Sequence, residues 1–337
     1  MNSNVLVAMD KFRGTASARE MSEAVASAVQ SMGLAADVQP MSDGGEGFRD
    51  AFVGDVEVVD VAGPLGERVE ASVTFVTTSH GRRAVIEVAD AVGRQLLKNP
   101  APHQALAAQS GGVGELILAA ARLGASEVVV GCGGSATSDG GLGCYQVLRE
   151  AGGLPIPVIA ATDIDALFSG ARRYAAQKGV RSEDLLIIDE RLSSIRDRYL
   201  NEQGVDVELL ERAGAAGGIA GALASLGATL VSGFDAVSSA VGLPERIESA
   251  QLVITGEGRF DSGSLEGKVT VGMAQLAAGR TPVLVVCGSV DDDAAAIFSG
   301  RFPNSSIASL ERRFGLEIAL NQVLDCAAVV VKESLQN

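Results

Sequence analysis

Short apolar segments alternate with helix-forming segments at both ends of this 337-residue chain. Near the start, an apolar strand expected at residues 5–9 precedes a helix that begins with a capping box, Ser17 to Glu20, and that Gly33 can end. A second strand is expected at residues 36–40. A strand, a helix and a strand at this spacing form a βαβ unit, in which the two strands run parallel. The sequence therefore predicts an α/β fold built on a parallel sheet.

The last hundred residues repeat this alternation, whereas the middle of the chain differs. Between residues 69 and 75 apolar side chains recur at every second position, which predicts an antiparallel hairpin with one buried face. We expect residues 1–58 and 245–337 to form one three-layer domain, with residues 59–244 inserted as a second, mixed α/β domain. The cleft between two such domains is the expected place for ligands.

The composition excludes several classes of partner. Lys and Arg total 27 against 42 Asp and Glu, and this net charge of −15 would repel a nucleic acid. No apolar run approaches the ~20 residues that span a membrane, and the first residues do not have the pattern of a signal peptide. The four cysteines show no C-x-x-C spacing. We therefore expect a cytoplasmic protein with reduced thiols and no nucleic-acid or membrane partner.

Three glycine-rich loops follow expected strands, at residues 43–47, 131–143 and 256–268. Ligands of open α/β sheets bind outside the carboxyl ends of the strands. Glycine there lets backbone N–H groups approach phosphate oxygens, and the next helix adds its positive N-terminal dipole. The pattern Ser-Asp-Gly-Gly-x-Gly occurs twice, at 42–47 and 138–143, and is also compatible with a helix cap alone.

Two better-known phosphate motifs nearly match and are rejected. The run from Gly131 to Ala136 imitates a dinucleotide fingerprint, but its helix would have to pass through the adjacent Gly140 and Gly141. The run from Gly263 to Val269 is one residue short of a P-loop and has Val where Ser or Thr would hold magnesium.

Four carboxylates, those of Asp10, Asp163, Glu257 and Asp261, lie just past apolar strands. Carboxylates at this edge can coordinate Mg²⁺ or take a proton from a substrate hydroxyl, and each of them could instead be a loop or capping residue.

Seven motifs in order resemble the class I glycerate kinase family over most of the chain. They are residues 9–14 with Ser17, 40–47, 63–66, 114–117, 131–143, 213–218, and 252–261 with Gly267 and Lys268. The chain departs from the family pattern after Asp163, where the usual Asn-Pro-Leu stretch is replaced by the shortened segment 165–170.

The resemblance implies a flavodoxin-like domain with an inserted second domain. It also implies an ATP- and Mg²⁺-dependent kinase that phosphorylates the 2-hydroxyl of glycerate to give 2-phosphoglycerate and ADP. The alternatives left open are a kinase for a different small hydroxy acid, a non-catalytic nucleotide- or acid-binding relative, and a dinucleotide-dependent oxidoreductase. The expected assembly is a monomer or a homodimer.

From the motifs and the resemblance together we predict four groups of site residues. The predicted catalytic residues are Asp163, Lys11 and Asp43. The predicted acceptor-binding residues are Asp10, Arg13, Ser17, Gly44, Gly45, Glu46, Gln177 and Lys178. The predicted nucleotide-binding residues are Gly133, Gly134, Ser135, Thr137, Glu257, Arg259 and Lys268. The predicted metal ligands are Asp139 and Asp261.

Overall fold

The structure is a computed structural model that describes residues 4–45, 47–78, 81–266 and 268–336. The chain folds into two compact units, of which the first joins Met1–Asp43 to Val237–Asn337 and the second is Gly44–Ala236. This confirms the α/β fold class with a second unit inserted into the first. The unit boundaries lie near 43 and 236 rather than at the expected 58 and 245. The first boundary moves because the strand that starts at Asp55 pairs within the second unit.

The sheet of the first unit has five parallel strands in the order β11-β10-β9-β1-β2. Their bounds are β1 Asn4–Met9, β2 Ala35–Val38, β9 Leu252–Phe260, β10 Val283–Val290 and β11 Ser305–Ser309. Counted along the chain, these strands have the order 2-1-3-4-5 of a flavodoxin-like sheet. In such a sheet the ligand crevice lies where the order reverses, at the carboxyl ends of β1 and β9.

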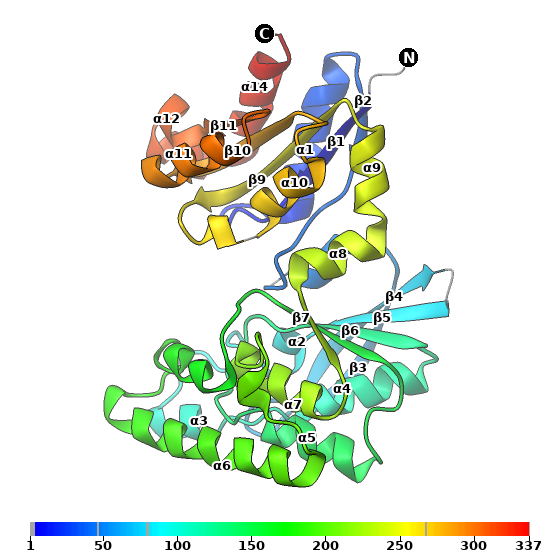
Figure 1. Cartoon of the computed structure of the whole chain (residues 1–337), viewed down its shortest axis with the longest axis vertical. Helices are drawn as coiled ribbons and strands as arrows, with labels where there is room; N and C mark the ends of the chain where they lie inside the picture. The colour runs from blue at the N-terminus through cyan, green and yellow to red at the C-terminus, as the bar shows by residue number, and fades with distance from the viewer. Residues whose placement is uncertain (1–3, 46, 79–80, 267, 337) are drawn as a thin grey trace. The chain divides into compact units, whose positions relative to one another are not determined.

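Helices cover both faces of this first sheet (Figure 1). On one face, α1 (Ala18–Ser31) and α14 (Val323–Gln336) pack against each other and against alternate strand residues. On the opposite face, α10 (Val269–Ala277) packs against β9 and β10. The other helices of this unit are α9 (Leu243–Ser249), α11 (Asp292–Arg301), α12 (Leu310–Phe314), α13 (Leu316–Asn321) and the 3₁₀ turn η7 (Ser264–Glu266). The predicted capping box is confirmed, because Ser17 and Glu20 bond each other's backbone N–H.

The second unit has a six-stranded mixed sheet in the order β3-β4-β5-β6-β7-β8. The strand bounds are β3 Asp55–Ala62, β4 Arg68–Thr78, β5 Gly81–Glu87, β6 Glu127–Gly131, β7 Val158–Thr162 and β8 Thr229–Ser232. The first three strands are antiparallel, which confirms the predicted hairpin, and β5 to β8 are parallel.

Apolar residues of α4, α5 and α7 form one core with one face of this second sheet. The α-helices are α2 Val88–Val92, α3 Pro102–Ala107, α4 Gly111–Arg122, α5 Leu142–Glu150, α6 Leu185–Gln203, α7 Ile219–Ser225 and α8 Gly233–Val241, which crosses the unit boundary. The 3₁₀ turns are η1 Phe48–Ala51, η2 Phe168–Tyr174, η3 Ala176–Lys178, η4 Ser182–Asp184, η5 Val207–Leu209 and η6 Ala215–Gly217.

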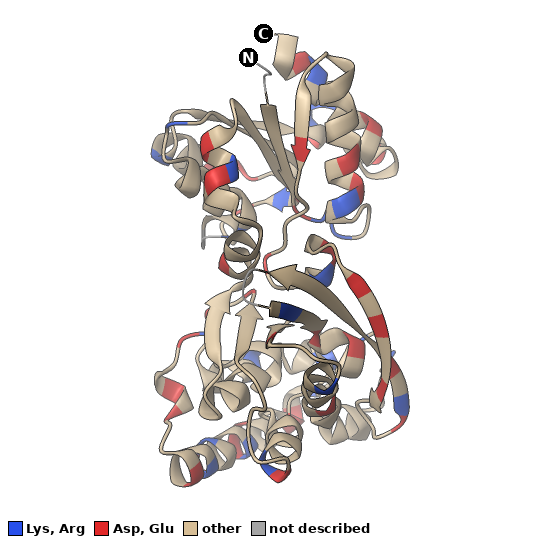
Figure 2. Cartoon of the chain, turned by 90° about the vertical axis from the view of Figure 1, so that its right-hand side faces the viewer, with Lys and Arg blue, Asp and Glu red and all other residues tan. Residues whose placement is uncertain are grey.

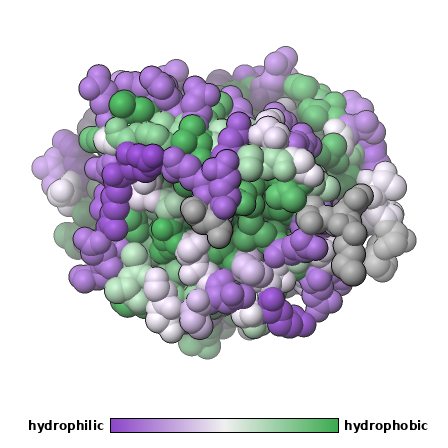
Figure 3. Space-filling model, turned by 90° about the horizontal axis from the view of Figure 1, so that it is seen from above, coloured by the Kyte–Doolittle hydropathy of each residue, from purple (hydrophilic) through white to green (hydrophobic). Residues whose placement is uncertain are grey.

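The edge strand β3 carries the exposed acidic residues Asp55, Glu57 and Asp60, and acidic residues are drawn red in Figure 2. Charged residues on an edge strand oppose pairing with a second sheet. On the face seen in Figure 3, hydrophobic areas lie between hydrophilic side chains. Within the described part of the chain, none of the helices combines the length and apolarity that crossing a membrane requires.

Candidate functional site

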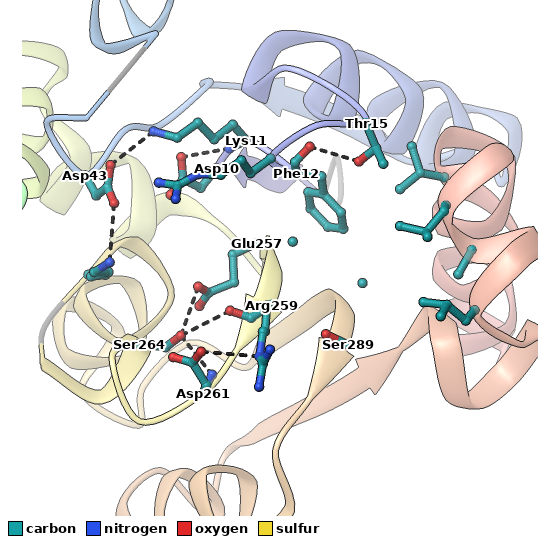
Figure 4. A pocket seen from close by; sticks show the side chains of 18 residues that line it. Asp10, Lys11, Phe12, Thr15, Asp43, Glu257, Arg259, Asp261, Ser264 and Ser289 are labelled. Carbon is teal, nitrogen blue, oxygen red and sulfur yellow. Dashed lines mark hydrogen bonds and ion pairs between the residues drawn. The ribbon is translucent and has the colours of Figure 1, made fainter. Parts of the chain in front are cut away.

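A cavity of about 390 Å³ lies in the first unit at the carboxyl ends of β1 and β9 (Figure 4). We call it the switch-point cavity, because β1 and β9 are the strands between which the strand order reverses. It brings together eight of the predicted site residues: Asp10, Lys11, Arg13, Asp43, Glu257, Arg259, Asp261 and Lys268. The cavity is therefore lined by four carboxylates and four cations.

Close packing of β1, β9 and β10 holds the side chains of Asp10 and Glu257 at the carboxyl-end edge of the sheet. Asp10 follows β1 directly, and its N–H donates a hydrogen bond of 2.9 Å to the Gly256 carbonyl of β9. A side chain at Gly256 is excluded, because its Cβ would lie 1.9 Å from the Val286 oxygen of β10. Glu257 is the next residue of β9, and it lines the same cavity as Asp10 at the carboxyl-end edge of the sheet.

The glycine-rich segment after residue 255 is not the loop that the sequence predicted. β9 continues to Phe260 and pairs Glu257 with Cys287 and Arg259 with Ser289 of β10. Gly258 and Gly288 allow the close approach of these two strands, because a Cβ at Gly288 would lie 2.4 Å from the Gly258 oxygen. The glycines therefore serve strand packing at this point, and Glu257 and Arg259 project from a strand.

Asp43 lies between two lysines (Figure 4). Its Oδ1 is 3.3 Å from Lys11 Nζ and its Oδ2 is 3.8 Å from Lys268 Nζ, while the Asp43 side chain is only 9% exposed. Lys11 Nζ lies within hydrogen-bonding distance of Asp43, and Lys268 Nζ lies slightly farther away. Burial strengthens the attraction between these opposite charges. The three residues connect the ends of three separate segments of the first unit.

Two carboxyl groups in this cavity have strongly raised pKa values. Burial raises the pKa of Asp10 to about 7, the charge of Asp43 adds to the effect, and Lys11 opposes it. Burial likewise raises the pKa of Glu257 to about 7, although its oxygens accept hydrogen bonds from the Thr270 and Ser264 hydroxyls. A carboxyl group with a pKa near neutrality can take up or release a proton during a reaction.

Asp261 and Arg259 form the exposed rim of the cavity. The Gly263 N–H donates a hydrogen bond of 2.9 Å to Asp261 Oδ1, and Arg259 Nε is 3.4 Å from Asp261 Oδ2. Asp261 keeps room for a further partner because it is 40% exposed.

The opposite wall of the switch-point cavity is apolar and was not predicted. It consists of Phe12, Leu316, Ala319 and Leu320 together with Val323 at the start of α14. Leu316 and Leu320 are more than half exposed, which is unusual for leucine in a helix that packs on a core. The exposure of these two leucines is the signal that reveals the apolar wall. It cannot be read from the sequence, because it is known only once α13 has been placed in the fold.

In the second unit, the predicted residues Gly133, Gly134, Ser135 and Thr137 follow β6. The hydroxyls of Ser135 and Thr137 are buried and lie 3.0 Å apart, and the Thr137 N–H donates to Ser135 Oγ. The hydroxyls of these two predicted nucleotide-binding residues therefore hydrogen bond within the loop.

Asp139 acts as a structural acceptor in this arrangement. Its Oδ2 accepts hydrogen bonds from the N–H and hydroxyl of Ser110 and from the Gly143 N–H, and its Oδ1 accepts from the Gly141 N–H. These four donors fit the helix-cap interpretation of the motif better than the predicted role as a metal ligand. Within the described ranges, no group of three or more His, Cys, Asp or Glu side chains is arranged to hold a metal ion.

Asp163 and Lys178 act on each other electrostatically in the second unit. Asp163 follows β7. Lys178 is the buried residue of the turn η3, and its Nζ donates a 2.5 Å hydrogen bond to the Thr137 carbonyl. Burial lowers the pKa of Lys178 to about 8, while the charges of Asp139 and Asp163 oppose that shift. Gln177 and Lys178 also line a second cavity, whose lining residues all belong to the second unit.

Of the remaining predicted residues, Ser17 and Gly44 have structural positions. Ser17 caps α1 and does not line the switch-point cavity. Gly44 has a φ of +96°, and a Cβ there would lie 2.9 Å from the Thr162 carbonyl carbon, so the backbone itself requires glycine. The Gly45 carbonyl accepts a 3.2 Å hydrogen bond from the Phe48 N–H, and Glu46 lies outside the described residues.

The dinucleotide alternative is not supported by the local geometry. The helix after β6 begins only at Leu142, because Gly140 and Gly141 both adopt left-handed conformations with φ of 64° and 74°. A dinucleotide fold would need the helix N-terminus directly after the first glycines.

The fold and the switch-point cavity define a flavodoxin-like α/β protein with a charged cavity at the carboxyl ends of β1 and β9. The model of the glycerate kinase family matches residues 5–151 and 155–332. The chain is 35% identical over 337 residues to glycerate 2-kinase of Escherichia coli K12 and 34% identical over 339 residues to glycerate kinase of Bacillus subtilis 168, and each alignment covers 87% of both proteins. A crystal structure assigned as glycerate kinase 2 from Salmonella typhimurium LT2 superposes with a TM-score of 0.77 at 29% identity, covering 98% of this chain and 97% of that one. The chain belongs to the glycerate kinase family.

Proposed function

We propose that this protein transfers the γ-phosphoryl group of ATP to the 2-hydroxyl of glycerate, giving 2-phosphoglycerate and ADP. The observation that carries the proposal is the switch-point cavity, in which Asp10, Asp43 and Glu257 lie with Lys11 and Lys268. Phosphoryl transfer needs positioning and charge neutralisation more than covalent catalysis, and this set of groups supplies both. Family membership and the named relatives support glycerate as the acceptor.

The acceptor requires a cation for its carboxylate and a base for its hydroxyl. Lys11 and Arg13 line the cavity and are the proposed carboxylate contacts. Asp163, which belongs to the second unit, stays the base predicted from the sequence. Within the cavity the candidate base is Asp10, because its pKa of about 7 suits proton transfer at neutral pH. In the step itself the hydroxyl oxygen bonds to the γ-phosphorus, the bond to the ADP oxygen breaks, and the carboxylate takes the hydroxyl proton.

The nucleotide requires phosphate contacts and an apolar surface for its base. We propose that Lys268 contacts phosphate oxygens. The amides of Gly133, Gly134 and Ser135, which belong to the second unit, stay a prediction for this role. The apolar wall formed by Leu316 and its neighbours offers a surface for the adenine ring, which was not foreseen from the sequence.

Magnesium is the proposed metal, and the carboxylates of the switch-point cavity fit its chemistry. Mg²⁺ prefers oxygen ligands and keeps several waters, so one or two carboxylates suffice beside the substrate phosphates. One or two of Asp43, Glu257 and Asp261 would hold it. Asp139 fits less well because its oxygens already accept four hydrogen bonds. When bound, the ion neutralises charge on the transferring phosphoryl group.

The proposed location is the cytoplasm, because all four cysteines are free thiols in the structure.

Product analysis by ³¹P NMR tests the reaction, because it distinguishes 2- from 3-phosphoglycerate. The purified chain is incubated with ATP, Mg²⁺ and glycerate, and parallel samples contain other small hydroxy acids. Formation of 2-phosphoglycerate is the expected result. A faster reaction with another hydroxy acid would favour a different acceptor, and nucleotide binding without turnover on any acid would identify a non-catalytic relative.

A further inference from the structure

The second cavity, of about 600 Å³, lies within the second unit and has an unusual charge. We call it the basic pocket. Its lining residues include three cations, Arg94, Lys98 and Lys178, and two amides, Asn99 and Gln177. Among the residues that the structure describes, no carboxylate lines it.

The three cations have no ion-pair partner in the described part of the chain. Seventeen ion pairs link lysines and arginines to carboxylates elsewhere in the molecule, but none of them involves Arg94, Lys98 or Lys178. The chain as a whole carries an excess of acidic residues. Three unpaired cations around one cavity repel each other, so an anion bound among them would lower the electrostatic energy.

Lys178 is the buried member of this set. Its ammonium group has three N–H donors, and the described residues accept one hydrogen bond from it, at the Thr137 carbonyl. Burial lowers the pKa of Lys178 to about 8, and the charge of Arg94 acts in the same direction. The two carboxylates whose charges act on it, Asp139 and Asp163, do not line the basic pocket.

We propose that the basic pocket is a binding site for the phosphate group of a small organic phosphate. Arg94, Lys98 and Lys178 supply the charge, and the amides of Asn99 and Gln177 supply further donors. A phosphate dianion matches three cations better than a single carboxylate does, because it brings twice the charge and three acceptor oxygens. The volume exceeds that of one phosphate group, so the pocket has room for the organic part of the ligand.

The proposal draws on the proposed function only for the choice of probes. If the chain is the proposed kinase, the phosphate belongs to its product or to its nucleotide; otherwise the pocket takes phosphate from another source. The probes are therefore inorganic phosphate, 2-phosphoglycerate and ADP, each titrated alone and without Mg²⁺.

The test compares two double variants by ³¹P NMR titration. Arg94→Gln with Lys98→Gln removes two exposed charges of the basic pocket without touching the buried Lys178. The matched control is Arg122→Gln with Arg149→Gln, which removes two exposed charges of the same unit that line neither cavity. Circular dichroism and thermal unfolding show whether all proteins are folded alike.

The pocket variant is expected to bind at least one of the three probes on the order of tenfold more weakly than wild type, as expected for lost charge-assisted hydrogen bonds. The control variant is expected to bind as wild type does. The probe whose affinity falls most identifies the source of the phosphate. Absence of binding to the wild type, unchanged affinity in the pocket variant, or an equal loss in the control variant would each overturn the proposal. Turnover is measured separately, so a chain that binds phosphate here but makes no 2-phosphoglycerate would refute the proposed function and leave this inference standing.

Discussion

Replacing Asp10 by Asn should stabilise the protein at neutral pH while lowering its activity. Asp10 is buried, and its carboxyl group must either keep a proton or bear a charge in a poorly hydrated cavity beside Asp43. Asn has nearly the same shape, can accept the hydrogen bond that the Lys11 N–H donates at 2.7 Å, and does not ionise. A residue retained for binding or catalysis at the expense of stability behaves in this way.

The magnitude follows from the raised pKa of Asp10. A pKa of about 7 in the folded protein, against the usual 3.8, means that the folded state holds the proton more tightly than the unfolded state does. The resulting stabilisation is fully present below pH 3.8 and is lost as the pH rises to about 7. At about 1.4 kcal/mol per pH unit the whole loss is on the order of 4 kcal/mol, and about 2 kcal/mol of it falls between pH 5.5 and 7.

Hydrogen exchange can measure this effect in the first unit alone, which matters because a chain of two units need not unfold in one step. Peptides from β1 and β9 are followed by mass spectrometry in wild type and Asp10→Asn at the same pH, so that intrinsic exchange rates cancel. At pH 8 the variant should exchange up to ~10³-fold more slowly, and at pH 5.5 the ratio should shrink by a factor of roughly 30.

The control is Asp293→Asn, which changes an exposed carboxylate on α11 of the same unit and should alter stability by less than ~0.5 kcal/mol. The reasoning about burial is refuted if Asp10→Asn is no more stable than wild type at pH 8, or if its advantage does not depend on pH. A functional role for Asp10 requires that turnover falls while stability rises, because loss of a purely structural residue would lower both.

Three further substitutions test the other parts of the site. Asp163→Asn should lower kcat by roughly 10²–10⁴-fold in the coupled ADP-release assay if Asp163 is the base, whereas the neighbouring Asp165→Asn should not; equal turnover in both variants would reject that role. Lys268→Met should raise the KM for ATP more than it lowers kcat, because it removes a point charge from the cavity beside Asp43; an unchanged KM would exclude Lys268 from nucleotide binding. Asp139→Ala should lower the free energy of unfolding by roughly 3–5 kcal/mol in urea titrations, because four donors lose their acceptor, and a stable variant with weakened Mg²⁺ affinity would restore the predicted metal role.

Much of the switch-point cavity could be predicted from the sequence because its acidic residues follow parallel strands. Asp10 and Glu257 come from opposite ends of the chain, and the rule that ligands bind at the carboxyl edge is enough to expect them together. The rule does not say how far a strand extends. Glu257 and Arg259 were expected in a loop, and only the pairing with β10 shows that they lie on β9.

The parts that escaped prediction depend on contacts between segments distant in sequence. Leu316 and Leu320 form an apolar wall because α13 ends beside the cavity, and their apolar pattern alone is that of an ordinary amphipathic helix. Arg94 and Lys98 were not singled out because an exposed cation is usually a solvated surface residue. They become notable only when the fold brings η3, which carries Lys178, to the same cavity.

The two cavities also show why a net charge of −15 is a weak guide to the ligands of this chain. The net charge argues against a long anionic polymer, whose charges would all meet the protein's average field. A small anion responds instead to the groups within about one Debye length, roughly 8 Å at physiological ionic strength. In the switch-point cavity the cations are balanced by carboxylates, so an anionic ligand there must share Lys11 and Lys268 with Asp43. In the basic pocket the cations face no lining carboxylate among the described residues, and the local charge alone favours an anion. Local pairing of charges, rather than their sum, therefore decides which of the two cavities holds a phosphate more tightly.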